Sequence, residues 1–409
     1  MTIKLHRSEL KPDAAVTITG SKSESNRLLV LQALYPKLKI KNLSNADDTK
    51  LMQKALRSSD EIIDIGHAGT TMRFLTAYFA SQSKRELLLT GSDRMQERPI
   101  QILVDALNEL GADISYENKA GYPPLRIKGK KLSLDKVGLP ASVSSQYISA
   151  LLLMAPNLEN GLELTLEGEL TSIPYINMTL ELLNQIGVDT FFEENLIKVF
   201  PFKGLPKQKS ITVESDWSSA SYFYSLIALS EPGTQMRLSF YEPNSLQGDS
   251  ILAKIYNAFG VKTIFKDESI ILRKTTLNKY ASAEFELNDA PDLAQTIAVT
   301  CLGLGMSCHM TGLHTLKIKE TDRLKALKAE MEKLGAIVSI TDKSLTLEVA
   351  SGINENVAID TYHDHRMAMA FAPLAIKTSL QINDADVVSK SYPEFWKDLD
   401  QIGISFERI

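Results

Sequence analysis

Cysteine and long apolar segments are the two features that this sequence most clearly lacks. Its 409 residues include two cysteines, Cys301 and Cys308, too few for a disulfide framework and without metal-site spacing. We expect both to be buried thiols in a reducing compartment. No apolar run approaches the roughly 20 residues that a membrane helix needs, and the segment MTIKLHRSELKP has no signal-peptide core. The sequence therefore predicts a cytoplasmic protein that makes no membrane contact.

An excess of basic charge is absent as well. The formal net charge is -5, so we expect no nucleic-acid partner. The composition, 44% hydrophobic and 23% charged, is that of an ordinary soluble globular protein with enough length for two or three cores. A binding site for anions must therefore be a local cluster.

Two common catalytic or phosphate-binding motifs are also missing. Residues 19–27, TGSKSESNR, place glycine, lysine and serine before an apolar run. A serine separates Gly20 from Lys22, however, and Ala15 stands where a Walker P-loop has its first glycine. No G-x-S-x-G elbow occurs, so a nucleophilic triad has no support.

The segment HDH contains the only closely spaced histidines. His363 and His365 lie two residues apart, and His309 and His314 are further possible ligands. Two histidines at this spacing on a loop are weak support for a metal site. We expect neither a metal nor a cofactor.

A repeat runs through the chain. Five times an amphipathic helix pattern ends at a glycine and continues into a β-rich segment, as in ILVDALNELGADISY. A glycine just after the last helical turn can adopt the left-handed conformation that closes a helix. The five glycines are Gly111, Gly187, Gly260, Gly335 and Gly403.

A second set of helix patterns alternates with the first. Six helices begin on small or polar residues, and their starts recur about every 75 residues, except for a first interval about 27 residues shorter. We infer six copies of one α/β unit, the first abbreviated, in two domains of three, with a boundary near residues 210–217. The markers of these starts are Ser23, Thr70, Ser145, Ser218, Asp292 and His365.

Helix starts of this kind favour anions. Their free N–H groups and partial positive charge attract phosphate and carboxylate, and nearby arginines and lysines add charge. Taken singly, each start is also compatible with an ordinary cap, such as Thr321 before a helix or Asp292 as a first-turn charge. The prediction depends on the recurrence. The basic candidates are Lys22, Arg27, Arg73, Arg94, Arg98, Lys317, Lys319, Arg323, Arg366 and Lys390.

The motifs, taken in order, resemble a known family. GSKSESNR, AGTTMR, RMQERPI, SVSSQY, SDWSSASYF, NSLQGDS, PDLAQT, KETDRL and YHDHRMAMA are similar to those of the 5-enolpyruvylshikimate-3-phosphate synthases. The resemblance implies the two-domain enolpyruvyl transferase fold, an inside-out α/β barrel of six βαβαββ units. It implies an N-terminal domain of residues 20–214 and a C-terminal domain of residues 1–19 plus 215–409, between which the chain crosses twice.

The resemblance also implies an activity and its residues. The enolpyruvyl group of phosphoenolpyruvate would pass to the 5-hydroxyl of shikimate 3-phosphate through a tetrahedral intermediate in the interdomain cleft, with release of phosphate. Asp292 and Glu320 would be the proton-transfer pair, with Lys22 as a further proton donor. The shikimate 3-phosphate contacts would be Lys22, Ser23, Arg27, Ser144, Ser145, Gln146, Ser172, Asp292, Thr315 and Lys319, with Tyr175 nearby. The phosphoenolpyruvate contacts would be Lys22, Gly69, Arg98, Gln146, Arg323, Arg366 and Lys390.

Some residues depart from the family pattern. Thr315 stands where many family members have asparagine. His67 stands where asparagine or aspartate is more usual, and Ser215 stands where glycine is common. Two alternatives share the fold: the sister enzyme that acts on UDP-N-acetylglucosamine, and a protein that only binds anionic metabolites. The loop SDRMQERP has no cysteine, which disfavours the first, and both proton-transfer carboxylates are present, which disfavours the second. A metal-dependent hydrolase acting through HDH is a third alternative. We expect a monomer whose partners are small-molecule substrates.

Overall fold

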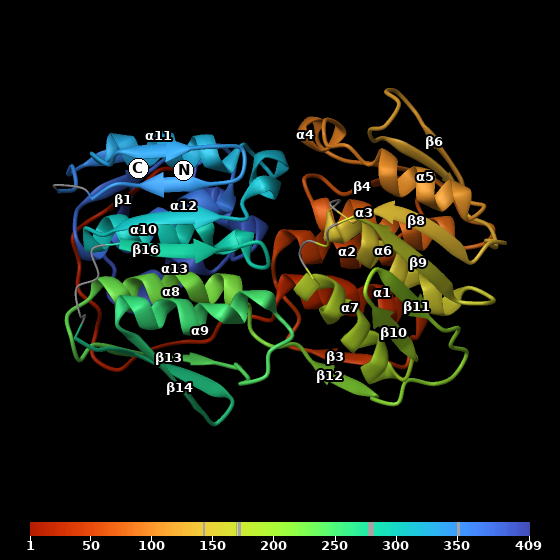
Figure 1. Ribbon diagram of the computed structural model, residues 1–409, viewed down its shortest axis with the longest axis horizontal. Helices are drawn as coiled ribbons and strands as arrows, with labels where there is room; N and C mark the ends of the chain where they lie inside the picture. Colours follow the sequence, from red (N-terminus) through yellow and green to blue (C-terminus); the bar gives the residue numbers. More distant parts are fainter. Residues whose placement is uncertain (142–143, 169, 171–172, 277–281, 350–351) are drawn as a thin grey trace. The chain divides into compact units, whose positions relative to one another are not determined.

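Two compact units make up the structure, a computed structural model (Figure 1). It describes residues 1–141, 144–168, 170, 173–276, 282–349 and 352–409. The N-terminal unit is Gly20–Val213, and the C-terminal unit joins Met1–Thr19 to Glu214–Ile409. Along the described chain, no helix is both long and apolar enough to cross a membrane.

Three central helices form the interior of the N-terminal unit. Helix α3 packs against both of the others and buries every residue except Tyr78. Apart from Arg73, its sequence, GTTMRFLTAYFA, is small or apolar on all sides, and a helix of this kind is stable only when it is enclosed. The three helices are α1 (Lys22–Leu34), α3 (Gly69–Ala80) and α6 (Ser145–Met154).

Two four-stranded sheets of this unit have the same topology. In each, the first two strands are parallel, and the fourth strand of the repeat lies between the second and the third. Strand β9, LELTLE, alternates buried and more exposed residues, as a half-buried strand should. In spatial order the strands are β4 (Ile62–Asp64), β5 (Glu86–Thr90), β7 (Leu125–Lys128) and β6 (Asp113–Tyr116), then β8 (Lys136–Pro140), β9 (Leu162–Glu167), β11 (Leu196–Val199) and β10 (Thr190–Glu193).

The abbreviated repeat has only a two-stranded sheet among the described residues. Strand β3 (Lys39–Lys41) pairs in parallel with β12 (Ser210–Thr212), and α2 (Asp47–Arg57) then leads to β4. The described strands of this repeat include no counterpart of the two antiparallel strands of the other repeats. As a result, one edge of β3 has no neighbouring strand in the described part of the chain.

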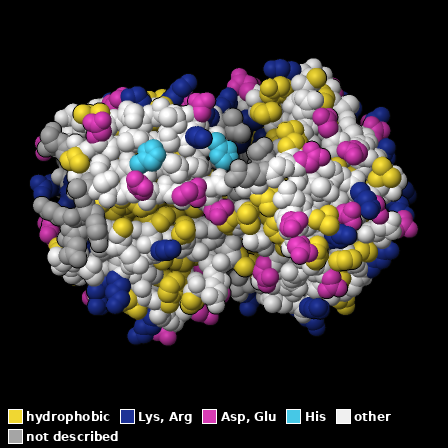
Figure 2. Space-filling model, in the orientation of Figure 1, with side chains coloured by type: hydrophobic (Ala, Val, Ile, Leu, Met, Phe, Trp, Pro, Cys, Tyr) yellow, Lys and Arg dark blue, Asp and Glu magenta, His cyan; other side chains and the backbone are white. Residues whose placement is uncertain are grey.

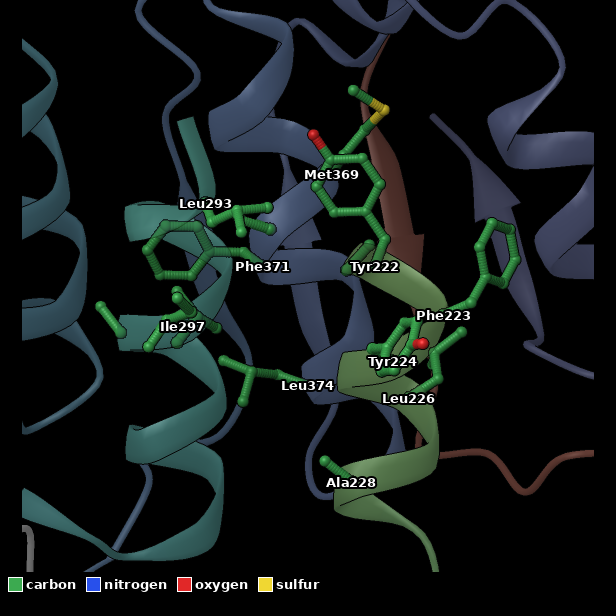
Figure 3. Close-up of a cluster of buried hydrophobic side chains, with 14 of the residues drawn as sticks. Tyr222, Phe223, Tyr224, Leu226, Ala228, Leu293, Ile297, Met369, Phe371 and Leu374 are labelled. Carbon is green, nitrogen blue, oxygen red and sulfur yellow. The ribbon is translucent and has the colours of Figure 1, made fainter. Parts of the chain in front are cut away.

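The C-terminal unit has a second set of three enclosed helices. Most residues of each are buried, and all three contribute to one hydrophobic core. In Figure 3, the Phe371 ring lies beside Ile297 of one helix, and Leu374 lies between Ile297 and Tyr224 of another. The helices are α8 (Trp217–Leu229), α10 (Ala294–Leu304) and α12 (His365–Phe371).

The first segment of the chain completes two sheets of this unit. Strand β2 pairs in parallel with β13 and occupies the position that the first strand of a repeat has in the other sheets. Strand β1 pairs with β21 and β22 and occupies the position of the fourth strand of a repeat. In spatial order the three sheets are β14 (Val261–Lys266), β15 (Ser269–Lys274), β13 (Gln235–Ser239) and β2 (Ala14–Val16); β16 (Ser282–Glu286), β17 (Ser307–Thr311), β19 (Leu345–Leu347) and β18 (Val338–Ile340); and β20 (Val357–Ile359), β21 (Leu380–Ile382), β1 (Ile3–Leu5) and β22 (Phe406–Arg408).

The predicted fold class is confirmed. The described strands form six separate sheets, three in each unit, and no closed β-barrel. Both cysteines are buried and form no disulfide. The five glycines predicted to end helices have φ between 71° and 108°, the left-handed conformation. They follow α5 (Gln101–Glu109), α7 (Ile173–Ile186), η3 (Tyr256–Phe259), α11 (Arg323–Lys333) and α13 (Phe395–Gln401).

One predicted helix differs in detail. The segment LAKIYNAFG reads as a single helix, but α9 (Leu252–Ile255) is one α-helical turn between the 3-10 turns η2 (Gly248–Ile251) and η3. Isoleucine, tyrosine, asparagine and phenylalanine are weak helix formers, so tertiary contacts decide the backbone there.

The exposed edge of β3 leads to a prediction about association. Lys39 and Lys41 are exposed, lie on the same face of the strand and form no ion pair with a described residue. Lysines on an edge strand discourage pairing with a second copy, since like charges would then face each other. The double variant Lys39→Thr and Lys41→Thr should therefore self-associate, as measured by light scattering during gel filtration.

The charge-matched control for the β3 variant is the double variant Lys50→Thr and Lys54→Thr on α2. The particle size of this control in solution should equal that of the wild type. If the β3 variant also stays at that size at high concentration, the lysines do not protect this edge.

Candidate functional site

Three helix starts meet in the C-terminal unit. Arg366 lies in the first turn of α12 and donates from Nη2 to Ser218 Oγ, 3.2 Å away in the first turn of α8. The same nitrogen lies 3.0 Å from Asp292 Oδ2, on the 3-10 turn η4 (Pro291–Leu293) that leads into α10. The three predicted starts of this unit therefore share one group of polar side chains.

Arg323 connects the carboxylates of this group. It begins α11 and is only 2% exposed. Its Nη1 donates to Asp292 Oδ1 at 2.8 Å and its Nη2 to Glu320 Oε2 at 2.7 Å. The two carboxylates that the sequence predicts as a proton-transfer pair are thus held by one guanidinium.

A third carboxylate, that of Asp364, completes the contacts of Arg323. Asp364 is fully buried and accepts from Arg323 Nε at 2.6 Å. It also caps α12 by accepting from the backbone N–H of Arg366 at 2.9 Å. Sequence reasoning missed this residue, because it treated HDH as a possible metal motif and considered only the histidines.

Neighbouring charges set the pKa values of Asp292 and Arg323. Burial alone would raise the pKa of Asp292, but Arg366, Lys319 and Arg323 outweigh it and hold that pKa well below its usual range. Burial lowers the pKa of Arg323, yet Asp364, Glu320 and Asp292 raise it overall. Lys319 Nζ lies 3.6 Å from Asp292 Oδ1. Three basic side chains thus lie beside the carboxyl groups of Asp292, Glu320 and Asp364.

Asp249 is a further buried carboxyl group that carried no predicted role. It lies on η2, within the quoted motif NSLQGDS, and accepts a hydrogen bond from Ser218 Oγ. Burial raises its pKa to about 6, although Arg366 opposes this shift. Asp249 thereby fixes the same serine that Arg366 contacts.

Lys390 and the HDH segment lie at the start of α12. Lys390 Nζ donates to the backbone carbonyl of His363 at 2.7 Å. His363 and the preceding Tyr362 have φ of 56° and 53°, a left-handed conformation that is costly for residues other than glycine. The His363 ring is exposed and pairs with Asp384. Within the described ranges, no group of three or more histidine, cysteine, aspartate or glutamate residues could hold a metal ion.

Thr315 does not join the Arg323 cluster through a side-chain hydrogen bond to any described residue. It lies on the 3-10 segment η5 (His314–Ile318), and its Oγ1 is buried without a hydrogen-bond partner in the described part of the chain. Its predicted contact with a ligand stays a prediction.

In the N-terminal unit, the buried Arg27 side chain links three helices through its hydrogen bonds. It is 2% exposed, and it donates to Thr179 Oγ1, Ser149 Oγ and the backbone carbonyl of Ser23 at 2.8–2.9 Å. Burial lowers its pKa to about 10. These contacts join α1 to α6 and α7, so Arg27 supports the start of α1 where Lys22 and Ser23 lie.

A second group forms where α3 and α6 begin. Gln146 Nε2 donates to Thr70 Oγ1 at 3.3 Å, and Ser144 caps α6. The Arg98 guanidinium lies against Gly69, since a Cβ built on Gly69 would be 2.6 Å from Arg98 Nη1. Ser145 begins α6. Ser172 lies outside the described residues.

The two units differ in charge balance. In the described part of the chain, Lys22 and the Arg98 guanidinium form no hydrogen bond or ion pair, and both lie at or beside helix starts. The C-terminal cluster pairs its cations with carboxylates. The first arrangement suits anion binding, and the second can also transfer protons. The molecular face in Figure 2 shows acidic and basic side chains intermixed, so a local site is needed for anions.

Comparison with solved structures identifies the class of protein by its fold. An EPSP synthase from Acinetobacter baumannii has a TM-score of 0.80 at 21% identity and covers 99% of both chains. The enolpyruvyl transferase NikO from Streptomyces tendae has a TM-score of 0.76 at 12% identity and covers 99% of this chain and 98% of its own. The chain has the fold of the enolpyruvyl transferases.

Sequence comparison identifies the family. The family model described as EPSP synthase (3-phosphoshikimate 1-carboxyvinyltransferase) matches residues 57–399. A 3-phosphoshikimate 1-carboxyvinyltransferase of Bacteroides fragilis is 46% identical over 402 residues, 96% of each chain. Another, of Haemophilus influenzae, is 35% identical over 425 residues, 95% of this chain and 96% of its own. The chain belongs to the EPSP synthase family.

The raised pKa of Asp249 leads to a prediction about stability. The folded protein binds this proton more tightly than the unfolded chain, so the contribution is present at low pH and lost as pH rises through about 6. The stability of Asp249→Asn relative to wild type should therefore increase by about 1 to 2 kcal/mol between about pH 5 and about pH 8. Urea unfolding of both proteins at the two pH values measures this change.

The exposed carboxylate Asp113 provides a control, because Asp113→Asn should shift stability equally at both pH values. A pH-independent difference for Asp249→Asn would mean that this carboxyl is not preferentially protonated in the folded protein.

Proposed function

We propose that this protein transfers the enolpyruvyl group of phosphoenolpyruvate to the 5-hydroxyl of shikimate 3-phosphate and releases phosphate. The observation that carries the proposal is the attachment of Asp292 and Glu320 to one buried guanidinium at converging helix starts. Relatives named 3-phosphoshikimate 1-carboxyvinyltransferase, one 46% identical, support the same reaction.

The reaction needs two proton transfers and one elimination. The hydroxyl oxygen attacks C2 of phosphoenolpyruvate and loses its proton, while C3 gains a proton. The tetrahedral intermediate then loses a proton from C3 as the bond from C2 to the phosphate oxygen breaks. Two carboxylates in different surroundings can divide this work, and we assign it to Asp292 and Glu320, with Lys22 as a further proton donor.

Ligand binding would change the basicity of Asp292. In the free protein its carboxylate is stabilised by Arg366, Lys319 and Arg323, which makes it a weak base. A substrate anion that binds these cations shares their charge and so raises the pKa of Asp292. The carboxylate would then become a better proton acceptor when substrate is present.

The binding roles follow the charge distribution. We propose that phosphoenolpyruvate is held by cations and a close backbone approach, and shikimate 3-phosphate mainly by hydroxyl groups and helix starts. The phosphoenolpyruvate set is Lys22, Gly69, Arg98, Gln146, Arg323, Arg366 and Lys390. The shikimate 3-phosphate set is Lys22, Ser23, Arg27, Ser144, Ser145, Gln146, Ser172, Asp292, Thr315 and Lys319.

Arg27 belongs to the second set in an indirect way. Its guanidinium already donates to Thr179, Ser149 and the Ser23 carbonyl, so we propose that it acts chiefly by fixing the start of α1. No metal or cofactor takes part in the proposed reaction. We also propose that the protein is monomeric and cytoplasmic.

The proposed reaction is tested by mixing the purified protein with both substrates and following phosphate release. Release should require shikimate 3-phosphate and should be matched by formation of the enolpyruvyl ether. Absence of release, or release without shikimate 3-phosphate, contradicts the proposal.

Substitution of the carboxylates tests their roles. Asp292→Asn and Glu320→Gln should each lower kcat by about 100-fold or more, since general acid–base catalysis contributes that much. Circular dichroism should show that both variants remain folded. Asp322→Asn is the control, because asparagine retains the cap of α11 and the Asp322 carboxylate bonds to Lys325 and not to the Arg323 guanidinium; its kcat should be close to wild type. Wild-type kcat in both variants of the pair would refute the assignment.

A further inference from the structure

The loop that carries Arg98 is tied to two central helices through one carbonyl oxygen. After β5, residues 91–99 form the short helix α4 (Asp93–Gln96) and then reach Pro99. The Pro99 carbonyl accepts a hydrogen bond from Tyr147 Oη at 2.6 Å and another from Arg73 Nη2 at 3.3 Å. Tyr147 lies on α6 and Arg73 on α3.

Arg73 also contacts Gly69, the residue against which the Arg98 guanidinium lies. Its Nη1 donates to the Gly69 carbonyl at 3.1 Å and lies 3.6 Å from Met95 Sδ. One guanidinium therefore touches the start of α3, the helix α4 and the residue that follows Arg98. Gly69 is the residue whose missing side chain makes room for the Arg98 guanidinium.

The arrangement places two like charges together. Arg73 is 4% exposed and makes its hydrogen bonds to neutral atoms. Burial, with a smaller contribution from the charge of Arg98, lowers its pKa to about 10, and both guanidinium groups lie against Gly69. Repulsion favours movement of Arg98 toward water, so a backbone tether next to Arg98 is needed to hold it at Gly69.

We propose that Tyr147 and Arg73 are positioning residues that act on phosphoenolpyruvate binding through Arg98. This inference rests on the proposed function, in which Arg98 binds that substrate. Tyr147 contributes one hydrogen bond from a side chain that is 7% exposed, and Arg73 contributes a rigid fork that spans Gly69 and Pro99. Neither residue needs to touch the substrate.

The Tyr147→Phe variant removes the hydroxyl group and leaves the ring. Loss of one hydrogen bond of ordinary net strength weakens binding by about threefold to tenfold. The KM for phosphoenolpyruvate should therefore rise by that factor. KM for shikimate 3-phosphate and kcat should change by less than about twofold, because the hydrogen bond acts on ground-state placement of one cation. Arg73→Lys retains the charge without the fork and should raise the same KM.

Tyr35→Phe is the matched control. The Tyr35 hydroxyl also donates to a backbone carbonyl, that of Phe202 at 3.0 Å, within the same unit. Its loss should leave all three kinetic constants near wild type. Melting temperatures of the variants should show that each remains folded at the assay temperature.

A double-mutant cycle separates positioning from a general effect on the fold. In an Arg98→Ala background, Tyr147→Phe should have no further effect on KM for phosphoenolpyruvate, because the residue through which it acts is gone. The inference is overturned if Tyr147→Phe alone has no effect, or if its effect is the same in both backgrounds. Failure of the proposed function would instead appear as absence of turnover in the wild-type protein.

Discussion

The burial of the Arg323 guanidinium is the constraint on which the candidate site depends. A buried charge is tolerated only when it is paired and hydrogen-bonded, and removal of one partner from such a pair costs about 3–5 kcal/mol. Arg323 meets this requirement with Asp292, Glu320 and Asp364. Three carboxylates around one cation leave an excess of negative charge, which Arg366 and Lys319 compensate. The need to pair these charges brings the starts of α8, α10, α11 and α12 together.

In the N-terminal unit, the buried guanidinium groups are hydrogen-bonded to neutral atoms and not to carboxylates. Arg27 and Arg73 are each buried, and their hydrogen bonds go to hydroxyl groups, carbonyl groups and a thioether. Burial lowers both pKa values to about 10, so both groups remain charged at neutral pH. Neither group forms an ion pair with a described residue. In the C-terminal unit, by contrast, the buried Arg323 guanidinium is paired with carboxylates.

The features that could be predicted from the sequence are local ones. The six helix starts and the five helix-ending glycines follow from side-chain chemistry within a few residues, and the abbreviated first repeat follows from their spacing. The contacts of Arg323 with Asp364 and of Tyr147 with Pro99 could not be predicted. Asp364 lies about 40 residues after its partner, and a backbone carbonyl leaves no signal in the sequence. Burial of Asp249 could not be predicted either, because the motif NSLQGDS is as polar as an exposed loop.

The fate of the bridging oxygen of phosphoenolpyruvate tests the central claim most directly. If the protein transfers the enolpyruvyl group, the bond between C2 and that oxygen breaks. A heavy oxygen isotope placed at the bridging position should then appear entirely in the released phosphate, with both substrates present. Appearance of the isotope in pyruvate instead would show cleavage between phosphorus and oxygen, and this would contradict the account.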